Sequence, residues 1–133
     1  MKLYGHTKFV TSLVWEPLHL RENANHLISS SKDFTIRLWN TDSGLCERSF
    51  GHHTNSVTKV LWTGQNEIIS GSEDQKIRVF DGNGSYLREM KQHSHWVNTM
   101  SLSTEFTLKR GCFTPDQKEQ EGTKHERALK LYK

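Results

Sequence analysis

Long hydrophobic runs, cysteine and proline are all scarce in this sequence. No apolar run approaches the ~20 residues that a membrane-spanning helix needs, and the opening residues, MKLYGH, have no apolar signal-peptide core. The two cysteines, Cys46 and Cys112, lie far apart and form no CxxC pair. We therefore expect no secretion signal, no disulfide, and two free thiols in a reducing compartment.

A strong charge of one sign is also missing. The net charge is +3; residues 1–100 contain 11 Lys and Arg against 10 Asp and Glu, and residues 101–133 contain 7 against 5. This excess is too slight for the dense basic face of a dedicated nucleic-acid binder. Contact with RNA inside a larger assembly stays open.

An internal repeat is the main positive feature. A His followed four residues later by Val occurs at positions 6, 53 and 93, so the repeats begin 47 and then 40 residues apart. A period of about 40–45 residues that starts near Gly-His and ends near Trp-Asp is typical of the WD40 propeller blade. The chain therefore resembles the WD40 repeat family.

Each of the first two repeats predicts four strands. Runs of β-branched and aromatic residues are interrupted by turn signals such as Asp42-Ser43-Gly44 and Asp81-Gly82-Asn83-Gly84. The expected strands cover 10–15, 27–31, 35–39 and 45–50 in the first unit, and 57–62, 67–70, 76–80 and 86–90 in the second.

The expected fold is all-β, a WD40 β-propeller segment of about two and a half four-stranded blades of an incomplete ring. Residues 1–50 and 51–90 are the two blades, 91–113 begin a third, and 114–133 form an insertion or charged tail that is helical or disordered. Such a segment cannot close a ring. It is part of a larger propeller or is completed by a partner.

Four polar or aromatic residues recur at matching offsets. Ser29 and Trp39 lie four before and six after Asp33, and Ser70 and Phe80 keep these offsets from Asp74. With His6 and His53, these sets resemble the WD40 structural tetrad, in which Asp, His, Ser and Trp form one hydrogen-bonded chain. Because Phe80 has no donor, we expect the second tetrad to be one link short and its blade to be the weaker.

The histidine, serine and aspartate residues also suggest two other kinds of site, a hydrolase triad and a metal site. A His, Ser and Asp cluster also suggests a hydrolase triad, but the cluster repeats once per blade and neither Ser lies in a nucleophile elbow. His52-His53 and His93-Ser94-His95 invite a metal site, yet no Cys or carboxylate cluster completes one. We expect no catalytic residue, no metal and no cofactor.

Partner contacts are expected on one face of the ring. By resemblance, WD40 proteins use the residues that flank the repeat Val and the residue just before the tetrad Asp. The candidates are Phe9, Thr11, Lys32, Ser56, Thr58, Glu73, Trp96 and Asn98. Exposed aromatic residues are common interface anchors, but Phe9 and Trp96 could equally pack within or between blades.

Several stretches are more specific than a general WD40 pattern. They are GHTK through WEPLH in residues 5–19, SSKD in residues 30–33, HWVNTMSLSTE in residues 95–105, LKRGCF in residues 108–113 and ERALKLY in residues 126–132. Together they resemble the middle blades of the Notchless family of WD40 ribosome-assembly factors. In that family the blade that begins HWVN is interrupted by an insertion, which would explain why the third unit loses its pattern.

The resemblance implies a non-enzymatic scaffold in maturation of the large (60S) ribosomal subunit, in the nucleolus and nucleus, with contacts to pre-60S protein and to rRNA. The family meets the midasin-type AAA ATPase through a ubiquitin-like domain that is not among these 133 residues, so no midasin-contacting residue is carried over. A general WD40 adaptor in signalling, such as the Notch pathway, or in ubiquitin ligation is the alternative.

Overall fold

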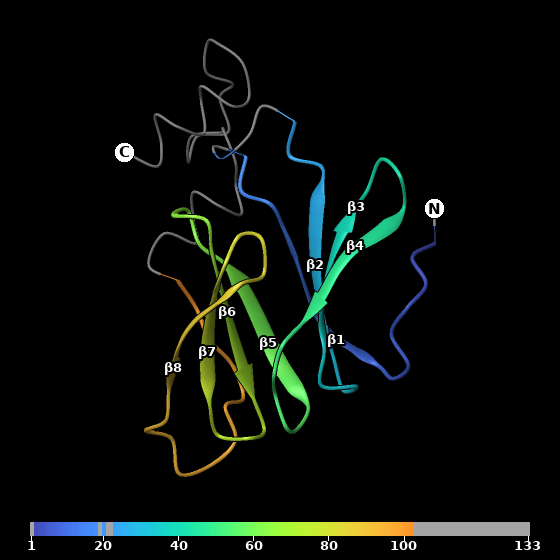
Figure 1. Cartoon of the computed structure of the whole chain (residues 1–133). Coiled ribbons are helices and arrows are strands. Elements are labelled where there is room, and N and C mark those ends of the chain that lie inside the picture. Colours follow the sequence, from blue (N-terminus) through green and yellow to red (C-terminus); the bar gives the residue numbers. More distant parts are fainter. Residues whose placement is uncertain (1, 19, 21–22, 103–133) are drawn as a thin grey trace, which may run out of the picture.

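The computed structural model describes residues 2–18, 20 and 23–102, and all regular structure in this part of the chain is β-strand. It contains two four-stranded antiparallel sheets, each in the order of its strands along the sequence. The predicted all-β fold, with two four-stranded blades side by side, is confirmed (Figure 1). Within the described residues, no helix is long and apolar enough to cross a membrane.

The strands begin and end close to the predicted positions. In the first sheet they are β1 (Val10–Trp15), β2 (His26–Ser31), β3 (Ile36–Asn40) and β4 (Leu45–Phe50). In the second they are β5 (Val57–Trp62), β6 (Glu67–Ser72), β7 (Ile77–Asp81) and β8 (Tyr86–Met90). Pro17 follows β1 closely, as expected of a residue that has no N–H for the ladder.

Tight turns join the second and third strands of each sheet in the same way. Phe34 and Gln75 occupy the same turn position and both have positive φ angles, 73° and 68°. The preceding Asp33 and Asp74 each accept a hydrogen bond from the backbone amide two residues on. These Asx turns fix where each carboxylate points.

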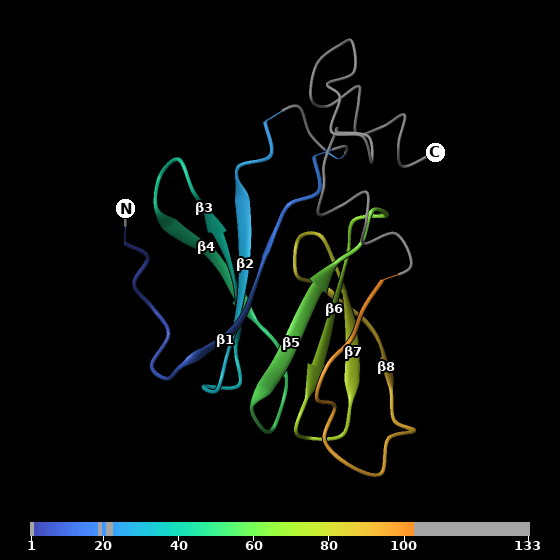
Figure 2. The same ribbon diagram turned by 180° about the vertical axis from the view of Figure 1, so that it is seen from behind.

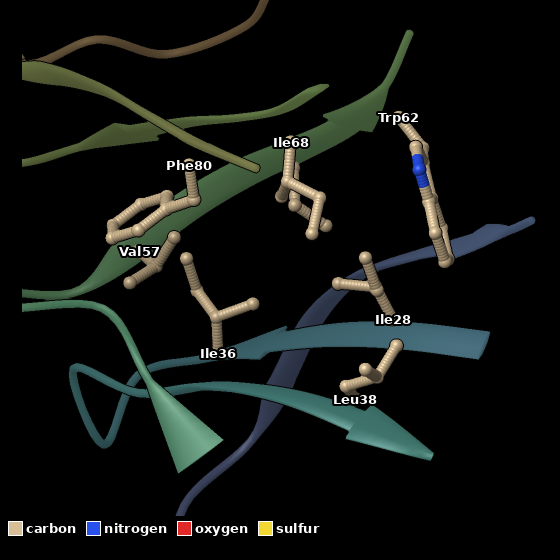
Figure 3. Close-up of a cluster of buried hydrophobic side chains, with 8 residues drawn as sticks. Ile28, Ile36, Leu38, Val57, Trp62, Ile68 and Phe80 are labelled. Carbon is tan, nitrogen blue, oxygen red and sulfur yellow. The ribbon is translucent and has the colours of Figure 1, made fainter. Parts of the chain in front are cut away.

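The core lies between the two sheets. Ile28, Ile36 and Leu38 of the first sheet point towards the second, where they meet Val57, Val60, Trp62, Ile68 and Phe80 (Figure 3). Branched side chains on alternate strand positions of both sheets therefore form one apolar layer. This packing fixes the second sheet against the first.

One flank of the first sheet lacks such cover among the described residues. Leu13 is 62% exposed, whereas Val60, the residue at the same position of β5, is 1% exposed. Trp15 and Trp62 differ in the same way, with exposures of 59% and 3%. The second sheet buries this face against the first sheet. The same face of the first sheet is exposed in the described part of the chain.

The start of the third unit forms no strand within residues 91–102. The Val97 amide donates to the carbonyl of Ser72, and the Val97 side chain is buried against Gly71. Residues 103–113, the rest of the predicted start of the third blade, lie outside the described residues. The predicted insertion or tail at 114–133 lies there too.

Candidate functional site

A hydrogen-bonded chain of four side chains links the elements of the first sheet. His6 Nδ1 lies 2.8 Å from Asp33 Oδ2, and His6 Nε2 lies 2.6 Å from Ser29 Oγ. The Trp39 indole donates to the same Ser29 Oγ over 2.8 Å. Since a carboxylate only accepts and an indole only donates, the chain runs from the indole through Ser29 and His6 to Asp33.

Asp33 is the most heavily bonded member of this chain. Its carboxylate accepts from His6, from the Thr7 amide, and from both the amide and the hydroxyl of Thr35. Burial alone would raise the pKa of Asp33, but these hydrogen bonds outweigh it and hold the pKa well below its usual 3.8. The carboxylate therefore stays ionised and anchors the segment before β1 to the β2–β3 turn.

The second sheet contains a related network that includes an arginine. His53 Nδ1 lies 2.9 Å from Asp74 Oδ2, and His53 Nε2 lies 2.7 Å from Ser70 Oγ. Arg78 Nη1 lies 3.1 Å from Asp74 Oδ2, and Arg78 Nε lies 3.3 Å from Glu89 Oε2. The cation thus joins the turn aspartate to the outer strand β8.

The expectation that the second network is simply one link short needs revision. Phe80 offers Ser70 no donor, as predicted, and its ring is fully buried in the core beside Phe50, with 5.0 Å between the ring centroids. The missing indole bond is accompanied by a buried ion pair that sequence reasoning missed. An arginine lies two residues before the aromatic in both units, as Arg37 and Arg78, so this spacing alone does not indicate which unit forms the ion pair.

The charges in this network set the protonation of its members. Burial is the main cause that lowers the pKa of His53 below its usual 6.5; Asp74 opposes this shift, and the Arg78 charge adds to it. Burial alone would raise the pKa of Asp74, but hydrogen bonds from His53 and the Thr54 amide outweigh it and lower that pKa. Neutral His53 beside ionised Asp74 is the resulting state.

The His, Ser and Asp atoms are spaced as in a hydrolase triad, but the surroundings differ. Ser29 is 3% exposed and its Oγ already accepts the Trp39 indole bond. Ser70, in the second network, is fully buried. A nucleophile must reach substrate, so this geometry favours a structural role. Within the described residues, no group of three His, Cys, Asp or Glu side chains could hold a metal ion.

The predicted partner-binding residues do not share one environment. Phe9, Lys32, Trp96 and Asn98 are exposed, Glu73 is half-buried, and Ser56 is buried. The Thr11 hydroxyl donates to the Val57 carbonyl over 2.6 Å, and the Thr58 hydroxyl donates to the Val97 carbonyl. Both threonines therefore bridge successive units, a role that their surface assignment did not anticipate.

The segments that carry these candidates gather at one end of the molecule. The β2–β3 and β6–β7 turns, the β4–β5 connection and the chain that follows β8 all lie at the lower end of the views from front and back (Figures 1 and 2). The segment that leads into β1 reaches the same end. Side chains from both units can therefore contact one partner there.

A second polar cluster lies between β1, β2 and β4, and sequence reasoning did not find it. His26 Nδ1 is 2.8 Å from Glu16 Oε2, and His26 Nε2 is 3.3 Å from Glu47 Oε2. Glu16 and His26 are buried beside a cavity of about 70 Å³ that Trp62 also lines. The three residues come from unrelated positions in the sequence, so no spacing rule relates them.

Repeated four-stranded sheets, each with its own Asp-His-Ser network, define a WD40 β-propeller segment. The WD40 family, described as WD domain, G-beta repeat, matches residues 1–40 and 44–81, and the chain belongs to this family.

Among individual proteins, the chain is similar to Protein Notchless of Drosophila melanogaster, with 37% identity over 85% of this chain and 23% of the relative. It is 42% identical to Ribosome assembly protein 4 of Saccharomyces cerevisiae over 73% of this chain and 20% of that protein. Ribosome biogenesis protein YTM1 of Lodderomyces elongisporus is 34% identical over 61% of this chain and 16% of the relative. The chain thus spans less than a quarter of the length of each of these relatives.

Proposed function

We propose that this chain forms part of a non-catalytic WD40 scaffold that mediates protein contacts in precursors of the large ribosomal subunit. The observation that carries the proposal is its similarity to relatives whose names state ribosome assembly or ribosome biogenesis. Ser29 and Ser70 are buried and their hydroxyls already hydrogen-bond within the two networks, which supports a scaffold over an enzyme. Nuclear and nucleolar localisation belongs to the same proposal.

The contact surface in this proposal is the end of the molecule that carries the turns. Its exposed candidates are Phe9, Lys32, Trp96 and Asn98, and the half-buried Glu73 lies in the β6–β7 turn. Thr11 and Thr58 bond carbonyls of the following unit and so hold successive units together, whereas the Ser56 carbonyl accepts from the Ser72 hydroxyl within its own unit. Contact with rRNA is secondary in the proposal, because the net charge is small. No contact with a midasin-type ATPase is assigned to these residues.

The test is affinity purification, from its own cells, of the protein that contains this chain. Co-purification of large-subunit precursor rRNA and assembly factors, with nucleolar localisation of the tagged protein, is expected. A double variant, Phe9→Ser with Lys32→Glu, should recover less precursor than Leu87→Ser, which alters an exposed apolar residue on the outer strand β8. Recovery of ubiquitin-ligase or signalling subunits without ribosomal precursors would contradict the proposal and favour the adaptor.

A further inference from the structure

A hollow of about 520 Å³ opens where the chain enters β1. Its lining residues are His6, Thr7, Lys8, Phe9 and Lys32. The Phe9 ring is 81% exposed, and both lysines are exposed. We refer to this feature as the basic-aromatic hollow.

The two lysines in the hollow have no carboxylate within ion-pair distance among the described residues. Asp33 bonds to the lining residues His6 and Thr7, and its other oxygen accepts from Thr35. The Lys8 ammonium lies 5.1 Å from the centre of the Phe34 ring, a contact that leaves its charge uncompensated. The hollow therefore presents positive charge to an incoming ligand.

The corresponding corner of the second unit has different chemistry. Ser56 takes the place of Phe9 and is buried, and Glu73 takes the place of Lys32. Both units nevertheless form the same turn, with the same Asp and His contact. The fold therefore does not need an exposed aromatic residue or a lysine here, and the hollow is not a by-product of the repeat.

We propose that the basic-aromatic hollow binds an acidic peptide segment of a partner protein. This inference rests on the proposed scaffold function and specifies the chemical class of the partner segment that binds. Carboxylates of the peptide pair with Lys8 and Lys32, and an apolar side chain packs on the exposed face of Phe9. Thr7 lines the same hollow.

A peptide fits this hollow better than single-stranded RNA does. Proteins that bind single-stranded RNA use a basic groove that follows the RNA backbone and several aromatic rings on which successive bases stack. The lining of the hollow contains two lysines and one phenylalanine ring, that of Phe9, and the next turn carries Glu73, whose charge repels phosphate. One or two carboxylates with a single apolar anchor match the size of the positive patch.

The direct test is fluorescence polarisation with the 133-residue chain and labelled probes. The probes are an acidic peptide, DELFED, its basic counterpart KKLFKK, its counterpart without apolar residues, DESSED, and a short oligouridine. We expect the chain to bind DELFED most tightly, with an affinity that falls as salt rises. Tighter binding of oligouridine that depends on Lys8 and Lys32 would overturn the peptide assignment.

Variants locate the binding. Reversing both charges, Lys8→Glu with Lys32→Glu, should weaken DELFED binding at least ~10-fold, because two attractive pairs become repulsive. Phe9→Ser should weaken it about 5-fold through loss of the apolar anchor. Lys91→Glu and Leu87→Ser, which change an exposed lysine and an exposed leucine away from the hollow, should leave it unchanged.

The outcomes separate this inference from the proposed function. All variants should keep the wild-type far-UV circular dichroism spectrum, since the altered side chains are exposed. If DELFED does not bind, or binds equally to all variants, the inference is wrong, even where purification recovers ribosomal precursors. If DELFED binds as described but purification recovers no precursors, the peptide site stands and the ribosomal function fails.

Discussion

The Arg78 guanidinium lies 3.1 Å from the Asp74 carboxylate, and both groups are almost fully buried. The equivalent Arg37 of the first unit has no such partner among the described residues. Its Nε is buried without a hydrogen bond, and its guanidinium lies 6.0 Å from the centre of the Trp39 ring. Two arginines at the same position of the repeat thus have opposite surroundings, which makes them a matched pair for experiment.

Arg78→Leu should destabilise the protein by about 3 kcal/mol, because it leaves the buried Asp74 charge without its cation. Arg37→Leu should cost less than ~1 kcal/mol, since no carboxylate loses a partner. Urea unfolding of both variants, followed by tryptophan fluorescence, measures the difference. Equal losses in the two variants would mean that the Asp74 pair contributes nothing specific.

Trp39→Phe should lower the free energy of unfolding by about 1–2 kcal/mol, because Ser29 loses the indole donor. Ser29→Ala should lower the free energy of unfolding by less in the Trp39→Phe background than in the unaltered protein, since both changes break the same bond. A thermodynamic cycle from urea unfolding tests this coupling. Strictly additive losses would show that the indole bond is not the interaction at stake.

Phe80→Trp is attractive from sequence alone, because it would restore an indole donor to the second network. That expectation holds only if the site has room for the larger ring, and the packing around Phe80 leads us to expect the opposite. Phe80 is fully buried against Phe50 and Tyr86, so a larger ring should overpack the core and destabilise by ~1–3 kcal/mol. Thermal unfolding decides the question, and a higher melting temperature would favour the sequence-based expectation.

Acid should weaken the fold in two stages. Folding lowers the pKa of His53, so the unfolded chain binds more protons just below pH 6.5 and stability falls as the pH drops. Folding also lowers the pKa values of Asp33 and Asp74 from 3.8, so the stability that they add is present above that pH and is lost at lower pH. Urea midpoints measured from neutral to acidic pH should follow this course.

His53→Asn isolates the first stage of the acid response. The variant is less stable at neutral pH, but its midpoint should change less between neutral pH and about pH 5, because the buried titrating ring is gone. Comparison of slopes, not of absolute stabilities, is the measurement. A slope as steep as that of the unaltered protein would assign the first stage to other groups.

Thr11→Val should weaken contact between the two sheets, because the Thr11 hydroxyl bonds the carbonyl of Val57 across the interface. A loss of about 1–2 kcal/mol is expected. Thr54→Val is the matched control, since Thr54 is exposed and only its backbone amide bonds Asp74. Equal effects of the two substitutions in urea unfolding would contradict the bridging role.

The strands and the first tetrad were predictable because their signals are local. Turn residues such as Asp33 and Gly44 limit the strands, and the offsets of Ser29 and Trp39 from Asp33 repeat in one alignment. The partners of Arg78 and the bridging bonds of Thr11 were not predictable in this way. Both depend on packing between strands or units, which a pattern within one repeat does not contain.

The threonine bridges give the array a direction. Thr11 in the first unit donates to Val57 of the second, and Thr58 in the second donates to Val97 of the third. A polypeptide is synthesised from its N-terminus. The Thr11 hydroxyl and the apolar face around Ile28 and Leu38 are therefore made before β5, the strand that packs against them. Each new unit can therefore dock onto one already made, and folding can keep pace with translation.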